Sequence, residues 1–179
     1  ISEELLDIYS KYSQRICNHF HLALQSGSNN ILKLMRRKYD NSRYLEAVNL
    51  IKSKLANPSI STDVIVGFPG ETEIDFNDTI KLIKSSKFSK IHFFPYSDRP
   101  GTSSYYFNNK IKPEIKKERM KIALQLAKTE ESTYRRNVLN QTRNILWEKP
   151  LSQSPSIFEG YSEDYLRIQT ESDYNLYNI

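Results

Sequence analysis

The chain has 179 residues, of which 38% are hydrophobic, and a formal net charge of +5 at pH 7. This length allows one domain with a sizeable core and a small second unit, and no window approaches the roughly 18 consecutive apolar residues that a membrane-spanning helix needs. The single cysteine, Cys17, excludes an internal disulfide and any metal site built from several cysteines, which indicates a reducing, cytoplasmic setting.

The chain begins Ile1-Ser2-Glu3 with neither an initiator methionine nor a signal peptide, so we expect it to be part of a longer protein. Helices are expected over 2–14, 29–38, 43–55 and 72–86, and strands over 21–24, 60–66 and 91–97. Strands separated by helices imply a parallel sheet with right-handed connections, and therefore an α/β fold. Thr72 and Asp75 have the spacing of a capping box at the start of the fourth helix.

The second part of the chain has a different pattern of predicted elements. Residues 98–112 are expected to form a loop whose three aromatic residues either pack it down or contact a substrate. Pro113 then begins a long amphipathic helix that extends to about residue 140. Short strands are expected over 143–147, 157–158, 165–170 and 176–179. We therefore divide the chain into residues 1–140 and 141–179, the second unit being either a truncated β-barrel or a β-extension of the first.

Polar and glycine residues follow each of the three predicted parallel strands, at the position where α/β proteins bind ligands. The motifs are HLALQSGS at 21–28, VIVGFPGE at 64–71 and IHFFPYS at 91–97. Because the carboxyl ends of parallel strands meet at one edge of a sheet, we expect Gln25, Gly67 and Tyr96 to share a rim.

The first two motifs each have a plainer interpretation. Gln25 and Ser26 offer an amide and a hydroxyl suited to a ribose or carboxylate, and Gly27 lets the backbone come close, but Ser26 and Ser28 could equally cap the next helix. The segment 67–72 leads into a helix N-terminus, where free N–H groups attract anions. It lacks the spacing of a phosphate loop, so an ordinary strand-to-helix connection is the favoured alternative.

The third motif and a basic cluster also have two interpretations each. Pro95 removes a backbone donor where the third strand ends, which frees nearby groups to meet a flat base such as adenine beside Tyr96. An aromatic edge strand with a turn explains the same pattern. Arg36 and Arg37 close a helix, where the dipole favours cations, and either could also contact a carboxylate or phosphate.

The remaining reactive side chains predict no catalytic residue and no metal ligand. The histidines His19, His21 and His92 are scattered and lack acidic or cysteine partners at ligand spacing. Cys17 is expected to be a small buried hydrophobic residue rather than a nucleophile. No Ser/His/Asp arrangement and no closely spaced carboxylate pair stands out.

Taken together, the motifs HLALQSGS (21–28), MRRKY (35–39), TDVIVGFPGET (62–72) and FPYSDRPGT (94–102) resemble the radical S-adenosylmethionine methylthiotransferases that modify tRNA. Their order and spacing match over nearly the whole chain. KKERM (116–120) and GYSEDYLR (160–167) resemble that family's linker helix and the start of its carboxyl-terminal RNA-binding TRAM module.

Within the family, CNHFH (17–21) and HFFPYS (92–97) are most similar to the branch that acts on N6-threonylcarbamoyl-adenosine beside the anticodon. The isopentenyl-adenosine branch carries a related Tyr-Ser-x-Arg-x-Gly-Thr element and is the alternative. Arg99 argues against the branch that modifies a ribosomal protein, because that branch usually has acidic residues in this region.

The resemblance implies the later half of a partial (β/α) barrel, with tRNA and the missing amino-terminal part of the same protein as partners. The family's catalytic [4Fe–4S] cluster is held by a Cys-x3-Cys-x2-Cys loop, which is absent here, so its ligands would lie outside these residues. The implied chemistry is reductive cleavage of S-adenosylmethionine, hydrogen abstraction from the adenine ring and insertion of a methylthio group delivered through a second cluster. The protein positions the reactants and excludes water from them. The 179 residues alone are expected to be inactive.

The resemblance also implies residue roles. Cofactor binding is expected at Gln25, Ser26, Arg36, Val66, Gly67, Phe68, Phe94, Pro95 and Tyr96. Contacts with the RNA substrate are expected at Arg99, Lys116, Lys117, Arg143 and Arg167.

Three other functions stay open. The chain could be only an RNA-binding piece, a radical enzyme of the same fold with another substrate, or a structural α/β domain. In the first case the β-rich tail and a basic set would follow phosphates; that set is Lys110, Lys112, Lys116, Lys117, Arg119 and Lys121.

Overall fold

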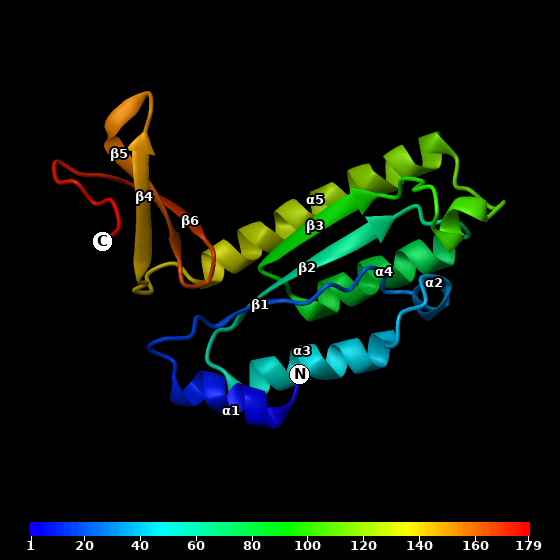
Figure 1. Cartoon of the computed structure of the whole chain (residues 1–179), viewed down its shortest axis with the longest axis horizontal. Helices are drawn as coiled ribbons and strands as arrows, with labels where there is room; N and C mark the ends of the chain where they lie inside the picture. The colour runs from blue at the N-terminus through cyan, green and yellow to red at the C-terminus, as the bar shows by residue number, and fades with distance from the viewer.

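A computed structural model describes all of residues 1–179 and contains two three-stranded sheets joined by one long helix (Figure 1). The α/β fold class is confirmed, because the first sheet is parallel and its strands alternate with helices. The helices are α1 (Glu3–Lys11), α2 (Asn29–Leu34), α3 (Asn41–Lys54), α4 (Glu73–Ser86) and α5 (Pro113–Asn137), with the short 3-10 helix η1 (Ser103–Tyr106). The strands are β1 (His19–His21), β2 (Ser59–Val66), β3 (Lys90–Pro95), β4 (Ile145–Leu151), β5 (Ser154–Ser162) and β6 (Arg167–Glu171).

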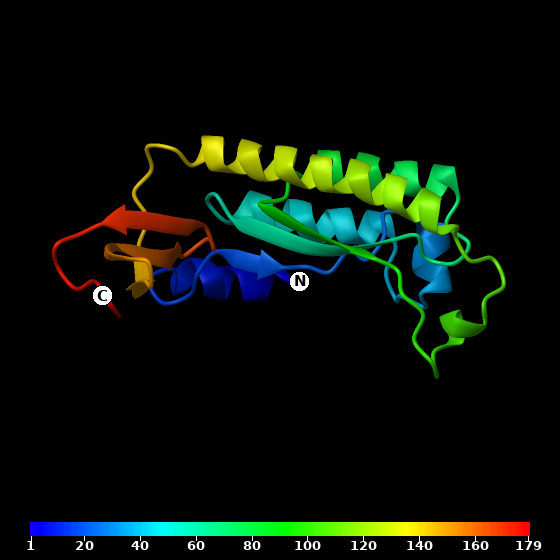
Figure 2. The same ribbon diagram turned by 90° about the horizontal axis from the view of Figure 1, so that it is seen from above.

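The parallel sheet has β2 at its centre, with β1 paired to one side and β3 to the other. Side chains alternate between the two faces of a strand, so Ile60, Val64 and Val66 of β2 share one face, where all three are buried. Figure 2 shows α3, α4 and α5 on one side of β2 and β3, and Figure 1 places the remaining long helix, α1, beyond β1 rather than across the other face. The sheet therefore has one covered face and one uncovered face.

The hydrophobic core lies between the covered face and the helices. Val48 and Ile51 of α3 and Phe76 and Ile83 of α4 recur at helical spacing, so each pair lies on one side of its helix and joins the core. Burial of a side chain of this size contributes about 1.5–3 kcal/mol. These apolar contacts hold the helices on one face, while the other face carries polar side chains such as Asp63 together with Ile65 and Phe94.

The ends of the helices follow local signals. The predicted capping box is present at α4, since Asp75 N–H donates to Thr72 Oγ1 at 3.2 Å and Thr72 N–H donates to Asp75 Oδ2 at 2.8 Å. Ser28 caps α2. That helix ends at Leu34, earlier than predicted, because Arg36 adopts a left-handed conformation with φ of 55° that a right-handed helix cannot include.

The first strand lies earlier than the predicted 21–24. The strand ends at His21, yet the chain continues beside β2, because Leu22 N–H donates to the Ser61 carbonyl at 2.9 Å. Farther on, Gln25 forms an isolated parallel bridge with Val64. None of the helices in the structure combines the length and the apolar character that a membrane crossing requires.

The second sheet is antiparallel, with the order β4-β5-β6, and lies at the carboxyl end of α5 (Figure 1). Asp164 fastens it to the first unit: its carbonyl accepts a hydrogen bond from the Ser59 hydroxyl at 3.0 Å, and its carboxylate accepts one from Tyr134 at 2.8 Å. Burial and this hydrogen bond raise the pKa of Tyr134. The expected strand over 176–179 is wrong, because the tail closes a turn through a hydrogen bond within those residues.

Two isoleucines of α4 test the core. Ile83 is 0% exposed and Ile74 is 73% exposed on the same helix. We expect Ile83→Ala to lower the free energy of unfolding by about 2–5 kcal/mol, because it leaves a cavity, and Ile74→Ala to change it by less than about 0.5 kcal/mol. Denaturant titration followed by circular dichroism measures both; equal effects would contradict the described core.

Candidate functional site

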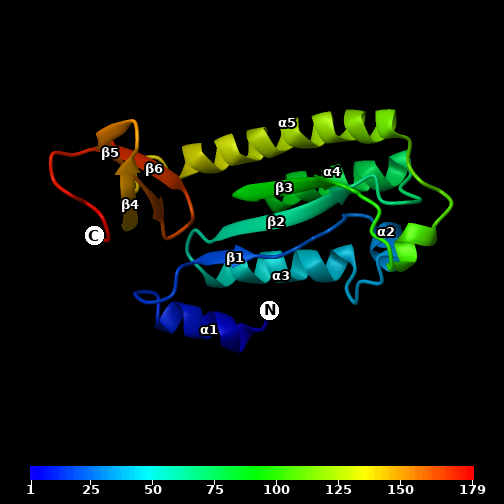
Figure 3. The same ribbon diagram turned by 45° about the horizontal axis from the view of Figure 1, so that its top comes forward.

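A hollow of about 710 Å³ lies at the carboxyl ends of β1, β2 and β3, and Figure 3 shows these strands side by side, running toward α2 and the loop before α5. Small-molecule sites commonly measure about 300–1,000 Å³. We call it the strand-end hollow. Its lining residues are Gln25, Leu34, Met35, Arg36, Arg37, Asp63, Ile65, Phe68, Phe94, Pro95, Tyr96, Ser97, Arg99, Thr102, Ser103 and Ser104. The structure thus brings together Gln25, Arg36, Phe68, Phe94, Pro95 and Tyr96 from the predicted cofactor residues.

Gln25 reaches the hollow from the segment after β1, in a left-handed conformation with φ of 64°. Its main chain stays in the sheet, because its N–H donates to the Asp63 carbonyl at 2.8 Å and its carbonyl accepts from Ile65 N–H at 2.9 Å. Gln25 and Asp63 both line the hollow. An amide and a carboxylate therefore border the same space, a combination that binds hydroxyl and amino groups.

Aromatic rings border the same hollow. Phe68 meets Tyr96 edge to face, with 5.1 Å between ring centroids, and meets Phe107 at 6.2 Å. Tyr96 N–H donates to the Val66 carbonyl at 2.8 Å, which keeps the chain after β3 alongside β2. Phe94 adds a ring that is 49% exposed. Flat apolar groups beside polar ones suit a ligand with a planar ring and a polar end.

Three of the predicted cofactor residues lie behind this hollow rather than in its wall. Ser26 is fully buried, and its hydroxyl lies 3.3 Å from Thr79 Oγ1. Val66 belongs to the core. Gly67 donates its N–H to the Glu71 carboxylate at 2.9 Å, so this donor already has a partner within the protein.

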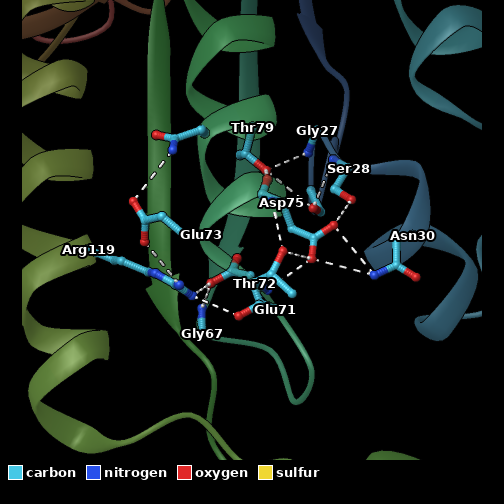
Figure 4. Close-up of polar contacts among 12 residues, drawn as sticks. Gly27, Ser28, Asn30, Gly67, Glu71, Thr72, Glu73, Asp75, Thr79 and Arg119 are labelled. Carbon is cyan, nitrogen blue, oxygen red and sulfur yellow. Dashed lines mark hydrogen bonds and ion pairs between the residues drawn. The ribbon is translucent and has the colours of Figure 1, made fainter.

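The turn after β1 is bound tightly to α4 (Figure 4). Gly27 N–H donates to Thr79 Oγ1 at 2.9 Å, and a Cβ atom added to Gly27 would lie 2.5 Å from the Cα of Thr79. Only glycine permits this approach of two backbones. The role of Gly27 shown by the structure is therefore contact with a helix.

Asp75 joins the two turns that follow β1 and β2 (Figure 4). Its carboxylate accepts hydrogen bonds from the Ser28 hydroxyl at 2.5 Å and from the Thr72 hydroxyl at 2.6 Å. Burial alone would raise the pKa of Asp75, but these donors and the Thr72 N–H outweigh it and hold the pKa below its usual range. Asp75 therefore stays ionised and keeps Ser28 at the start of α2.

Glu71 and Arg119 form a buried ion pair that locks the turn after β2 to α5 (Figure 4). Arg119 Nη1 lies 2.7 Å from Glu71 Oε2 and also donates to the Glu71 carbonyl at 3.0 Å. Burial raises the pKa of Glu71, opposed by the N–H of Gly67 and by Arg119. Arg119 also meets the exposed Glu73 at 3.3 Å and stacks over the Phe76 ring at 5.4 Å.

The sequence did not predict this ion pair. The pair also shows that the expected contact of Arg119 with RNA is wrong. Arg119 cannot follow RNA phosphates with the surrounding lysines, because it is buried beneath the turn after β2. A signal was present in the sequence: Arg119 lies one helical turn before Ala123, on the side of α5 that faces the core. A buried arginine requires a carboxylate partner, and Glu71 provides it.

The predicted RNA contacts are spread along the molecule. Arg99 lines the strand-end hollow, and Lys117 is exposed on α5. Lys116 donates to the Tyr96 carbonyl at 3.4 Å. Arg143 pairs with Asp164 at 3.4 Å and Arg167 pairs with Glu159 at 2.5 Å, so carboxylates within the chain neutralise these two charges.

The histidines are not scattered, which corrects another expectation. His19, His21 and His92 line a second hollow of about 610 Å³ between the uncovered face of the sheet and the loop after β5. His21 Nε2 lies 3.3 Å from Asp63 Oδ2. Burial and the neighbouring His21 lower the pKa of His19. No group of three or more metal-ligating side chains in the structure is arranged to hold an ion, and Cys17 is exposed rather than buried.

Comparisons with known proteins show which proteins this chain is similar to. A sequence model of the radical SAM superfamily matches residues 1–83. The chain is 38% identical over 172 residues to the threonylcarbamoyladenosine tRNA methylthiotransferase of Bacillus subtilis, an alignment that covers 94% of this chain and 38% of the relative. The protein of the same name from Thermotoga maritima is 35% identical over 167 residues, covering 93% of this chain and 38% of the relative.

A relative with a different substrate in its name is almost as similar. The tRNA-2-methylthio-N(6)-dimethylallyladenosine synthase of Alkaliphilus oremlandii is 35% identical over 176 residues, covering 98% of this chain and 37% of the relative. The chain therefore spans less than two fifths of the length of these relatives.

The buried ion pair yields a matched test. We expect Glu71→Gln to lower the free energy of unfolding by about 3–5 kcal/mol, because it leaves the buried Arg119 without a counter-charge. Glu73→Gln removes the exposed partner of the same guanidinium and should cost less than about 1 kcal/mol. Chemical denaturation at neutral pH measures both values. A similar small loss in both variants would mean that Glu71 and Arg119 are not held together as described.

Asp75 predicts a specific acid sensitivity. Because its pKa is depressed in the folded state, its contribution to stability is present above its ordinary value of 3.8 and is lost as pH falls through the lower folded value. We expect Asp75→Asn to destabilise the protein by about 1–3 kcal/mol at pH 7 and to flatten the decline in stability below about pH 4. Asp78→Asn on the same helix is the control and should keep the wild-type pH profile, since Asp78 is half-exposed beside Lys81. Unfolding midpoints of the wild type and both variants, measured from pH 7 to pH 2, test this prediction; equal pH profiles of Asp75→Asn and the wild type would contradict it.

Proposed function

We propose that this chain belongs to the radical SAM superfamily and forms the carboxyl-terminal part of a tRNA methylthiotransferase acting on N6-threonylcarbamoyl-adenosine next to the anticodon. The strand-end hollow is the observation that carries this proposal. It combines an amide, a carboxylate, guanidinium groups and aromatic rings at the carboxyl edge of a parallel sheet, where α/β proteins bind nucleotide-like ligands.

S-adenosylmethionine fits the donor set of this hollow. The rings of Phe68 and Tyr96 offer flat surfaces for adenine. The Gln25 amide and the Asp63 carboxylate suit ribose hydroxyls and the amino group of the methionine part. Arg36 supplies a cation for the methionine carboxylate. The three chemical parts of the cofactor thus each have a matching group.

A [4Fe–4S] cluster does not fit the residues of this chain, because such clusters are held mainly by several cysteine thiolates and Cys17 is the only cysteine. Cys17 lines a different hollow, together with Asn18 and Arg143. The cluster ligands therefore come from residues outside this chain. We expect the 179 residues alone to be inactive.

The role of this chain in the reaction is positioning. S-adenosylmethionine supplies radical chemistry when it is bound with the cluster. The residues here hold its adenosyl part and exclude water from it, since Ile65, Phe68 and Phe94 place apolar surface in the hollow. Placement matters because a shift of about 1 Å in the reacting geometry can cost about a hundredfold in rate.

We also propose a role in RNA binding for the part of the chain that contains the second sheet. We assign residues 1–140 to the later half of the barrel with its linker helix and residues 141–179 to the start of a TRAM-like RNA-binding module. The net charge of +5 favours a polyanionic partner. Among the proposed RNA contacts, Arg99 and Lys117 are the better supported, because Arg143 and Arg167 are paired with carboxylates. A tRNA partner would place the protein in the cytoplasm.

Nucleoside mass spectrometry of tRNA tests the proposal. A strain lacking the gene should lose 2-methylthio-N6-threonylcarbamoyl-adenosine, and the full-length gene should restore it. Full-length protein with Gln25→Ala should restore it about tenfold more slowly, because the lost hydrogen bonds weaken cofactor binding, whereas Gln125→Ala on the exposed side of α5 should match the wild type.

Other outcomes of the same experiment change the assignment. Loss of the methylthio group from dimethylallyl-adenosine instead would select the activity named for the Alkaliphilus relative. Unchanged tRNA nucleosides would contradict a methylthiotransferase function. Cleavage of S-adenosylmethionine by the purified 179 residues would show that the cluster ligands do not lie elsewhere.

A further inference from the structure

The loop between β3 and α5 presents two tyrosine rings to solvent beside the strand-end hollow. Tyr106 is 73% exposed and Tyr105 is 43% exposed, and their rings meet edge to face at 5.2 Å. Both belong to η1, whose first residues, Ser103 and Ser104, line the hollow. The rings therefore lie immediately next to the proposed cofactor site.

The loop that carries these rings is anchored from within. Phe107 packs against Phe68 at 6.2 Å, and the Asn109 carbonyl accepts the Gly70 N–H at 2.9 Å. The Thr102 hydroxyl donates to the Arg99 carbonyl at 2.8 Å. One aromatic residue of the loop is thus used for packing, and its two neighbours are left pointing outward on a fixed support.

Positive charge accompanies the rings. Lys110 Nζ lies 5.8 Å from the centre of the Tyr105 ring and 5.6 Å from that of Tyr96, within cation–π range. An ion pair with Asp98 neutralises this charge and, together with a hydrogen bond to the Ser104 carbonyl at 2.9 Å, keeps Lys110 in this position. Arg99, which forms no ion pair in the structure, supplies the cation available to RNA in the wall of the hollow. Exposed aromatic rings interleaved with cations are the usual surface for unpaired nucleic-acid bases.

We propose that Tyr105 and Tyr106 form a stacking platform for an unpaired RNA base that neighbours the adenosine to be modified. This inference rests on the proposed function and adds the element that positions the substrate strand. Stacking on aromatic rings tolerates any base, because every base has a π-face. The platform therefore fixes the path of the RNA loop beside the strand-end hollow and does not itself select the adenosine.

The first test measures RNA affinity with the full-length protein and a fluorescent anticodon stem–loop. Tyr106→Ala should weaken binding about tenfold, within the effect of removing one base–aromatic stack, and Tyr106→Phe should bind within about twofold of wild type because the ring remains. Tyr12→Ala is the matched control, since Tyr12 is 46% exposed at the end of α1, away from the hollow. Equal affinity of Tyr106→Ala and wild type would overturn the proposal.

A second test needs no variant. Tyrosine nitration of the full-length protein, mapped by peptide mass spectrometry, should modify Tyr105 and Tyr106 in the free protein and spare them when the stem–loop is bound. Equal nitration with and without RNA overturns the platform. Absence of nitration in the free protein also overturns it, because another part of the protein would then cover the rings.

The two tests separate this inference from the proposed function. If Tyr106→Ala forms the methylthio-nucleoside and binds RNA as tightly as the wild type, the platform is wrong and the enzyme assignment is unaffected. Failure of the wild-type protein to bind any anticodon stem–loop removes the basis of both.

Discussion

The carboxylate of Asp75 is the constraint on which the arrangement of the site depends. It is buried, stays ionised, and accepts hydrogen bonds from both Ser28 and Thr72. A buried charge is tolerated only when such donors surround it. The turn after β1 must therefore lie against the start of α4, with Gly27 against Thr79. This placement sends Ser26 inward and Gln25 into the strand-end hollow.

A second lock acts on the turn after β2. The Glu71 carboxylate binds the Gly67 N–H on one side and Arg119 on the other, which ties the turn to α5. A buried ion pair of this kind contributes little net stability compared with apolar residues of the same size. Its contribution here is geometric: it fixes the turn that carries Phe68, and with it one wall of the hollow.

Much of the fold could be predicted from the sequence, because the signals are local. Helical spacing, the capping box at Thr72 and the alternation of strands with helices indicated the parallel sheet. The same reasoning placed Gln25, Gly67 and Tyr96 on one rim; Gln25 and Tyr96 do line one hollow, whereas Gly67 is not part of its wall. It could not decide which of Gln25 and Ser26 faces outward, because the left-handed conformation of Gln25 interrupts the regular alternation of side chains.

The histidines and Arg119 show what long-range packing adds. His19 and His21 are two positions apart on β1 and therefore share a face, but the approach of His92 depends on the order of the strands. Likewise, the helical pattern places Arg119 toward the core, yet only the tertiary structure identifies Glu71 as its partner. These contacts join segments that are distant in sequence, so no local pattern encodes them.

The uncovered face of the parallel sheet carries polar side chains that bear on function. Parallel sheets are normally covered on both faces, whereas this face carries the polar contact between His21 and Asp63 and borders two hollows. Desolvating such side chains against a purely apolar partner would be costly. Whatever covers this face must therefore supply polar groups, either from a ligand or from other parts of a longer chain. The polarity of the face thus favours a ligand-binding interior over a hydrophobic packing surface.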